Sequence, residues 1–215
     1  MNRRLGVLIS GRGSNLQSII DAIDNGKLEA EIAVVISNKP GAHGLARARK
    51  AGIETVVLSH QDYPSRELFD LAVVDELRAR DVGLVCLAGF MRLLSPTFIL
   101  AFPNAILNIH PSLLPAFVGL DAQEQAWRYG VKIAGATVHI VTAELDSGPI
   151  VCQAAITINE AETAEMVASR ILTEEHRIYP EAIKTMLNGQ WRIEGRRFIS
   201  YYGRCVFLSG RSVRS

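Results

Sequence analysis

Short apolar runs alternate with stretches of helical periodicity in the first half of the chain. The runs have the length of strands that are buried on both faces. Between the first two runs, apolar residues recur at helical spacing, at Leu16, Ile19, Ile20 and Ile23. This alternation predicts a parallel sheet with right-handed crossovers, a Rossmann-like half. The expected strands are residues 5–10, 31–37, 55–58 and 83–89, and the expected helices are 16–23, 44–52 and 65–80.

In the second half of the chain, the pattern predicts a strand, a helical region and then a pair of strands. Residues 136–143 and 149–158 read as two strands joined by the turn residues ELDSG, so we expect them to be antiparallel. A long amphipathic helix closes the core. The expected elements are helix 95–102, strand 105–110, helix 122–129, strands 136–143 and 149–158, and helix 163–188.

The chain is expected to form one α/β domain over residues 1–215, because no repeat or Ser/Gly-rich linker divides it. The Rossmann-like half covers about residues 1–103, a C-terminal half about 104–190, and a tail about 191–215. The final residues, SGRSVRS, are basic and polar, and we expect them to fray.

Composition and charge narrow the possible partners. Of the 215 residues, 48% are apolar and 21% are charged, which is typical of a globular protein. The formal net charge of +1 gives no sign of a nucleic-acid or acidic-membrane partner. The three cysteines form no CxxC pair, and no apolar stretch has the length of a signal core or a membrane span. We expect a soluble, cytoplasmic protein, as a monomer or a homodimer.

The first candidate site is GRGSN, residues 11–15, at a strand-to-helix turn. Free N–H groups and the helix dipole favour a phosphate at such a turn. The segment matches neither the dinucleotide fingerprint nor the Walker loop, since Leu16 stands where the fingerprint needs glycine and no Gly-Lys-Ser/Thr follows. Two interpretations stay open: a cradle for a monophosphate, or a tight turn with Ser14 as the helix cap.

The second candidate site is NIHPSLLP, residues 108–115, at the end of the expected fifth strand. Because strand residues alternate between faces, Asn108 and His110 share one face at the carboxyl end of a parallel strand, where α/β proteins bind ligands. An Asn amide can stabilise an oxyanion, and a His can exchange protons near neutral pH. Asp146 could orient the imidazole only if the fold brings it there. We expect His139, which faces a neighbouring strand, to be structural.

Two other kinds of site are rejected. No serine stands in a G-x-S-x-G elbow, so Ser-His-Asp hydrolysis is not favoured. The five histidines show no helical or hairpin spacing with other ligands that would indicate a metal site, and we expect none.

The chain resembles the glycinamide ribonucleotide transformylases, folate-dependent formyltransferases of purine synthesis also called phosphoribosylglycinamide formyltransferases. The likeness runs in order from about residue 5 to about 187, in the segments ISGRGSNLQSII, LAGFMRLLSP, NIHPSLLPAFVGL, ATVHIVTAELDSGPIVCQA and EEHRIYPEAI. It implies a Rossmann-like formyltransferase fold, with helices on both faces of a mainly parallel sheet and an antiparallel C-terminal part. The implied reaction transfers the formyl group of 10-formyltetrahydrofolate, a co-substrate, to the amine of glycinamide ribonucleotide without a metal.

The resemblance also implies roles for particular residues. The catalytic trio would be Asn108, His110 and Asp146, with Asn108 also meeting the folate. The ribonucleotide site would use Glu175 and the phosphate-loop residues Gly13, Ser14 and Asn15. The expected folate contacts are Arg66, Met91, Arg92, Leu93 and Leu94.

Two related enzymes and one binding protein without enzymatic activity are the alternatives to this function. Formyltetrahydrofolate deformylase has an extra N-terminal domain and methionyl-tRNA formyltransferase an extra C-terminal one, so the limits of this chain favour the transformylase. A catalytically weak folate-binding module is the alternative outside the enzymes. Val118 and Asp121 depart from the Lys or Pro and the His common in the family. Asp121 is expected to cap the helix after it, with Glu124 completing a capping box, or else to add a second carboxylate near His110.

Overall fold

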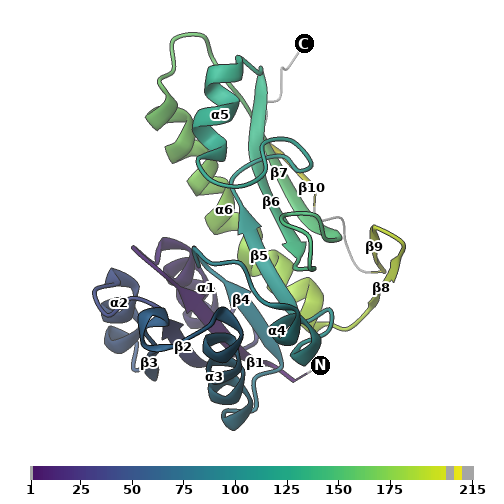
Figure 1. The fold of residues 1–215 in the computed structure, drawn as a ribbon. Coiled ribbons are helices and arrows are strands. Elements are labelled where there is room, and N and C mark those ends of the chain that lie inside the picture. Colours follow the sequence, from purple (N-terminus) through teal and green to yellow (C-terminus); the bar gives the residue numbers. More distant parts are fainter. Residues whose placement is uncertain (1, 202–205, 210–215) are drawn as a thin grey trace.

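The structure is a computed structural model that describes residues 2–201 and 206–209. It contains one ten-stranded sheet covered by helices (Figure 1). The strands are β1 (Arg4–Ile9), β2 (Glu31–Ser37), β3 (Thr55–Val57), β4 (Leu84–Leu87), β5 (Ile106–His110), β6 (Ile133–Ile140), β7 (Ile150–Thr157), β8 (Trp191–Glu194), β9 (Arg197–Ser200) and β10 (Val206–Ser209). The helices are α1 (Ser14–Asp24), α2 (His43–Lys50), α3 (Arg66–Ala79), α4 (Pro96–Ala101), α5 (Ala122–Tyr129) and α6 (Ala164–Leu187), with a 3₁₀ turn at His60–Asp62.

The strand order is β3-β2-β1-β4-β5-β6-β7-β9-β8, and β10 pairs with β7. Strands β1 to β5 pair in parallel, whereas β6 is antiparallel to both β5 and β7. The predicted mainly parallel sheet with an antiparallel C-terminal part is therefore confirmed. Right-handed crossovers place α1 and α2 on one face and α3 and α4 on the other, because the strand order reverses between β1 and β4. Ligands bind α/β sheets at such a reversal.

Helix α6 fastens the two halves of the sheet together. Its residues Val167, Ile171, Ile178 and Ile183 are fully buried. Tyr179 on the same helix is also fully buried, and its hydroxyl donates to the Leu87 carbonyl on β4 at 3.0 Å and to the Leu107 carbonyl on β5 at 3.2 Å. These bonds fix α6 against the two strands whose ends carry candidate site residues.

The tail adds strands that the sequence analysis did not predict. Strands β8 and β9 form an antiparallel hairpin with Gly195 in its turn, and Trp191 stacks on Phe198 with ring centroids 5.3 Å apart. Strand β10 ends at Ser209, and the rest of the SGRSVRS segment lies outside the described residues. No described helix is long and apolar enough to cross a membrane.

Candidate active site

Three of the predicted segments lie along one edge of the sheet. The 11–15 turn follows β1, residues 88–94 follow β4, and Asn108 and His110 end β5. Strand β4 lies between β1 and β5, and neighbouring strands are about 4.8 Å apart, so the ends of β1 and β5 are about 10 Å apart. One small-molecule complex can therefore span all three segments.

The fold brings Asp146 next to His110. The His110 Nδ1 atom is 3.5 Å from the Asp146 Oδ2 atom, and the side chains are only 6% and 7% exposed. Asp146 belongs to the turn between β6 and β7, and β6 pairs with β5. The antiparallel return of β6 thus brings a residue 36 positions along the chain to the histidine.

Backbone geometry fixes the turn that carries Asp146. Asp146 has a positive φ of 48°, a left-handed conformation that a carboxylate side chain tolerates better than most. Two residues later, a Cβ on Gly148 would collide with the Ile140 carbonyl oxygen, so no larger residue fits there without movement. The close approach of β6 and β7 at Gly148 therefore sets the position of the carboxylate.

The environment of Asp146 favours its charged form. Burial disfavours the carboxylate, but the His139 ring, whose Nε2 atom is 3.6 Å from the Asp146 Oδ1 atom, the Gly119 N–H at 2.9 Å and the nearby His110 imidazole outweigh this effect. The pKa of Asp146 is therefore lowered from its ordinary value. An ionised Asp146 can stabilise a protonated His110 during a reaction.

His139 belongs to the same cluster, although its place on a strand facing a neighbouring strand predicts a structural role. It lies opposite Asn108 in the β5–β6 register, and its Nε2 atom is 3.2 Å from the Asn108 Nδ2 atom. Its Nδ1 atom is 3.1 Å from the Ile140 carbonyl oxygen, which fits a neutral ring with the proton on Nδ1. In that tautomer Nε2 accepts one Asn108 N–H, and the other N–H of the amide stays available. His139 reaches Asn108 only because of the register of the antiparallel β5–β6 pair. The sequence does not determine that register.

The loop between β5 and α5 covers the trio in this structure. The His110 Nε2 atom lies 2.8 Å from the Phe117 carbonyl oxygen, and the Gly119 N–H donates to Asp146. The Ser112 hydroxyl also donates to the Ala116 carbonyl at 2.6 Å. Both nitrogens of His110 therefore face protein groups here. A ligand that needs Nε2 has to replace the Phe117 carbonyl.

The predicted capping box at Asp121 is wrong in its side-chain contacts. Asp121 does occupy the N-cap position of α5, but its φ is 55° and its side chain makes no capping hydrogen bond. A capping side chain requires an extended backbone at the cap, and the left-handed conformation of Asp121 turns the carboxylate away. Val118 and Asp121 are both exposed on this loop.

The 11–15 turn has the geometry of an uncapped helix start. Gly13 is the N-cap of α1 with a positive φ of 70°, and a Cβ there would collide with the backbone of Gly44. The interpretation of Ser14 as the cap is therefore wrong, because Ser14 is the first helical residue. No side chain caps α1 and its first turn holds no acidic residue. Its first N–H groups have no helical acceptor and suit an anion.

Asn15 and Glu175 join this turn to α6. The Asn15 Nδ2 atom donates to the Glu175 Oε2 atom at 2.7 Å, and the residues are 8% and 5% exposed. Burial raises the pKa of Glu175 to about 7, although the Asn15 hydrogen bond opposes the shift. The Asn15 Oδ1 atom is buried with no hydrogen-bond partner among the described residues. These two groups are poised to meet a polar ligand.

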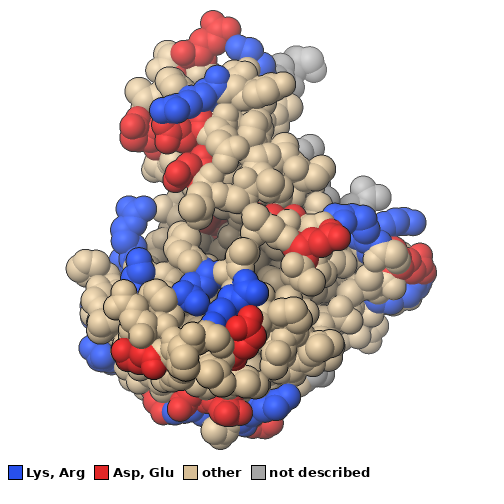
Figure 2. Space-filling view, in the orientation of Figure 1, with Lys and Arg blue, Asp and Glu red and all other residues tan. Residues whose placement is uncertain are grey.

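The segment expected to bind folate is partly open to solvent. Met91 and Leu93 are 65% and 55% exposed, which is unusual for apolar side chains beside a buried strand. Leu94 packs against the core, and the Arg92 guanidinium lies 4.9 Å from the centre of the Phe69 ring. Arg66 begins α3, with its Nε atom 3.6 Å from the Glu67 Oε1 atom. Figure 2 shows a hollow in this face, with Lys and Arg side chains along its lower lip.

Metal ligands are not gathered anywhere in the described part of the chain. Over residues 2–201 and 206–209, no group of three or more His, Cys, Asp or Glu side chains is arranged to hold a metal ion.

Comparison with known proteins gives a consistent set of relatives. A family model described as formyl transferase matches residues 3–183. Phosphoribosylglycinamide formyltransferase from Escherichia coli is 43% identical over 187 residues, covering 87% of this chain and 88% of that protein. The crystal structure of glycinamide ribonucleotide transformylase 1 from Symbiobacterium toebii is 55% identical, with a TM-score of 0.90, over 92% of this chain and 93% of that one.

Longer relatives contain the same region as one part. The trifunctional purine biosynthetic protein adenosine-3 of Drosophila pseudoobscura pseudoobscura is 46% identical over 192 residues, or 88% of this chain. The chain spans only 14% of the length of that relative.

Proposed function

The chain belongs to the formyl transferase family, and we propose that it transfers the formyl group of 10-formyltetrahydrofolate to the amine of glycinamide ribonucleotide, in de novo purine synthesis. The observation that carries the proposal is the buried His110–Asp146 pair, 3.5 Å apart, on the sheet edge that also holds the 11–15 turn and the 91–94 segment. Relatives named for this activity cover most of the chain at 43% and 55% identity. No metal enters the proposed reaction.

The proposed chemistry is direct transfer between two bound substrates. The neutral amine attacks the formyl carbon, a C–N bond forms and the formyl oxygen gains negative charge. The free N–H of Asn108 and a protonated His110 stabilise this oxyanion. The bond to N10 of the folate then breaks, N10 gains a proton and the amine loses one, with water as carrier. Holding both reactants on one sheet edge supplies much of the rate enhancement.

The polar neighbours of the trio set its charges and orientation. His139 accepts one N–H of Asn108, so the amide presents its other N–H in a fixed direction. The ionised Asp146 lies 3.5 Å from the His110 Nδ1 atom and so orients the imidazole. The loop holds the His110 Nε2 atom on the Phe117 carbonyl, so it opens or shifts when the formyl group arrives.

Substrate binding uses the two flanking segments. The phosphate of the ribonucleotide binds at the first turn of α1, over Gly13, Ser14 and Asn15, and Glu175 meets its ribose end. The folate lies on Met91 to Leu94, with Arg66 at the side of its carboxylates. Asn15 and Glu175 are joined at 2.7 Å, which supports a shared role at one ligand. We propose a cytoplasmic location for the protein, as a monomer or a homodimer.

Product analysis tests this function against its alternatives. The purified protein is incubated with 10-formyltetrahydrofolate, with and without glycinamide ribonucleotide and a chelator. We expect formylated ribonucleotide at the same rate in both chelator conditions. Free formate without formylated ribonucleotide would indicate a deformylase, and folate binding with neither product would indicate a binding module.

A further inference from the structure

Helix α2 packs directly against the 11–15 turn. A Cβ on Gly13 would lie 2.5 Å from the Gly44 Cα atom, and a Cβ on Gly44 would lie 3.2 Å from the Gly13 Cα atom, so the two backbones touch. The Gly44 N–H also donates to the Gly11 carbonyl at 3.0 Å. The start of α2 therefore fixes the backbone of the turn from one side.

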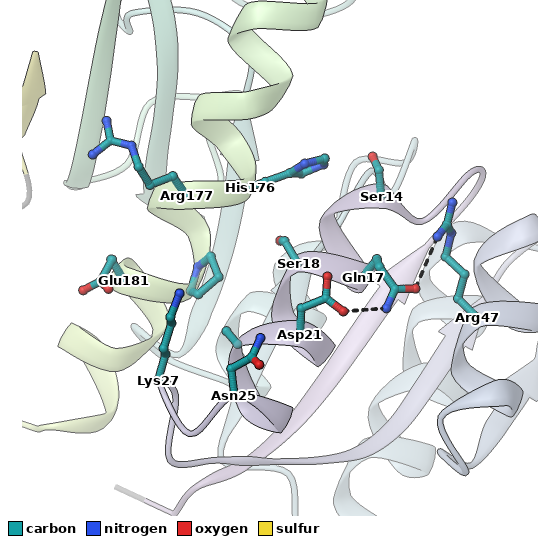
Figure 3. A pocket seen from close by; sticks show the side chains of 12 residues that line it. Ser14, Gln17, Ser18, Asp21, Asn25, Lys27, Arg47, His176, Arg177 and Glu181 are labelled. Atoms are coloured by element: carbon teal, nitrogen blue, oxygen red, sulfur yellow. Dashed lines mark hydrogen bonds between the residues drawn. The ribbon is translucent and has the colours of Figure 1, made fainter. Parts of the chain in front are cut away.

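Arg47, one turn further along α2, holds the next carbonyl of the 11–15 turn. Its Nε atom donates to the Arg12 carbonyl at 3.0 Å, and its Nη1 atom donates to the Gln17 Oε1 atom at 3.2 Å. Figure 3 shows the bond between Arg47 and Gln17 at the start of α1. One guanidinium thus binds both the turn and the helix that follows it, which fixes the turn against α1.

The direction of the Arg12 carbonyl decides where the next N–H group points. A trans peptide is planar, so the C=O of Arg12 and the N–H of Gly13 point in opposite directions. Since the carbonyl points at the Arg47 guanidinium, the Gly13 N–H points away from it. The bond from Gly44 to the Gly11 carbonyl turns the Arg12 N–H away from the start of α2 by the same rule. Neither N–H has a hydrogen-bond acceptor among the residues that the structure describes.

A buried side chain of the same turn also lacks a partner. Asn15 is 8% exposed, and no described residue forms a hydrogen bond with its Oδ1 atom. Buried amide oxygens usually have a partner, so an unused one at the start of a helix indicates a ligand. Free N–H groups suit an anion and the amide oxygen suits a hydroxyl, which together fit a sugar phosphate.

The positive charge of Arg47 stays close to the turn. A cavity of about 460 Å³ lies between α1 and α6, and its polar lining includes Ser14, Gln17, Asp21, Arg47 and His176 (Figure 3). Gln17 separates the charges, since its Nε2 atom donates to the Asp21 Oδ1 atom at 2.9 Å while its Oε1 atom accepts from Arg47. Over the described residues, no carboxylate forms an ion pair with Arg47. An unneutralised cation beside a helix start adds to its attraction for an anion.

We propose that Arg47 is a positioning residue for the phosphate of the ribonucleotide: it holds the Arg12 carbonyl and so points the Gly13 N–H at the anion. The inference rests on the proposed function, which puts this phosphate at the first turn of α1. Helix α2 follows β2, which lies on the opposite side of β1 from β4 and β5. Arg47 therefore acts on affinity for the substrate that carries the phosphate, and not on the transfer step at His110.

The test compares a substrate that has the phosphate with one that lacks it. Formyl transfer is measured for the wild type and Arg47→Gln with glycinamide ribonucleotide and with its dephosphorylated ribonucleoside. We expect Arg47→Gln to raise KM for the ribonucleotide about tenfold, the effect of one lost charge-assisted hydrogen bond, and to keep kcat within about twofold. With the ribonucleoside, kcat/KM should agree within about twofold in the two proteins, because it has no phosphate to position.

Arg49→Gln is the matched control for the loss of charge. Arg49 is an exposed arginine of the same helix, but its Nε atom donates to the Thr55 Oγ1 atom at 3.3 Å, on β3 at the edge of the sheet. The change removes the same charge from α2 without touching the 11–15 turn. It should leave KM for the ribonucleotide within about twofold of the wild-type value.

Three results would overturn the inference and leave the proposed function intact. They are an unchanged KM for the ribonucleotide in Arg47→Gln, an equal loss with the ribonucleoside, which would give Arg47 a role in the fold alone, and an equal rise in KM in Arg49→Gln, which would assign the effect to charge alone. If the wild type formylates neither substrate, the proposed function fails. Calorimetry with inorganic phosphate then decides the inference, since weaker binding by Arg47→Gln than by the wild type supports it and equal binding overturns it.

Discussion

At the scale of single residues, one contact fixes the orientation of the Asn108 side-chain amide. An unsupported Asn side chain can rotate, but the 3.2 Å contact with His139 Nε2 fixes which N–H is free. The sequence placed Asn108 and His110 on one strand face because strands alternate. It could not supply His139, since that pairing depends on the register of β6 against β5.

Removing the acceptor for Asn108 should reduce turnover mainly through Asn108. We predict that His139→Leu lowers kcat by about tenfold or more, because a freely rotating amide stabilises an oxyanion less well. Adding Asn108→Ala should lower kcat little beyond the Asn108→Ala variant, since both changes remove one function. Steady-state kinetics of the two single variants and the double variant measure this coupling. Fully additive losses would mean that His139 acts independently of Asn108.

The buried carboxylate of Glu175 should make stability depend on pH. Its pKa is raised from 4.5 to about 7, so the folded state keeps a proton that the unfolded chain releases between these values. The wild type therefore loses stability as pH rises through this window, by roughly 3 kcal/mol. Glu175→Gln keeps an acceptor for Asn15 without the charge, so it should be more stable than the wild type at pH 8 and similar to it near pH 4.5.

Urea unfolding at the two pH values measures the effect of Glu175→Gln. Glu181→Gln, at a partly exposed position of the same helix, is the control and should show no such trend. A constant difference between Glu175→Gln and the wild type at both pH values would show that burial does not hold a proton on Glu175.

At the scale of elements, the β6–β7 turn shows how strand packing positions the Asp146 carboxylate beside His110. We predict that Gly148→Ala lowers both stability and activity, because its Cβ would meet the Ile140 carbonyl and push the turn with Asp146 outward. The loss of stability should be about 2 kcal/mol or more, the range of backbone clashes at packed sites. Gly41→Ala, with open space around its Cβ, is the control for stability. Equal stability of Gly148→Ala and the wild type would contradict this packing account.

In the loop before α5, the structure changes what we expect Asp121 to contribute to stability. Asp121 makes no side-chain cap, so only its charge near the helix start contributes. Asp121→Asn, which tolerates the left-handed backbone, should lower the free energy of unfolding by only a few tenths of a kcal/mol. The pH–rate profile should not move. A loss above about 1 kcal/mol in thermal unfolding would exceed what a charge near the helix start contributes and would contradict this expectation.

Elements of strong periodicity were predicted within a few residues of their bounds. Helix 122–129 matches α5, and strand 31–37 matches β2, because caps and apolar runs define them locally. Strands β8 and β9 were missed, although Gly195 and Arg196 stand as a two-residue turn between short alternating segments. Strand β10 pairs with β7 about 50 residues away in sequence, and no local pattern encodes such a partner.

At the scale of the whole molecule, the strand order decides which segments meet. Alternation of strands and helices predicted the Rossmann-like half, and the reversal between β1 and β4 follows only from the assembled sheet. That reversal puts the 11–15 turn beside the 91–94 segment, and the antiparallel return of β6 and β7 adds Asp146. The sequence could name these segments by resemblance. Their common edge, and the loop that covers His110, are tertiary features.

The central claim is that this edge transfers a formyl group with the help of His110. The most direct measurement is a rapid-quench single turnover with ¹³C-formyl-labelled co-substrate and saturating glycinamide ribonucleotide, for the wild type and His110→Ala. We predict that the label reaches the ribonucleotide amine, and that His110→Ala transfers it about 100 to 10,000 times more slowly while still binding the ribonucleotide. Transfer by His110→Ala at the rate of the wild type, or label found only in free formate, would contradict the account.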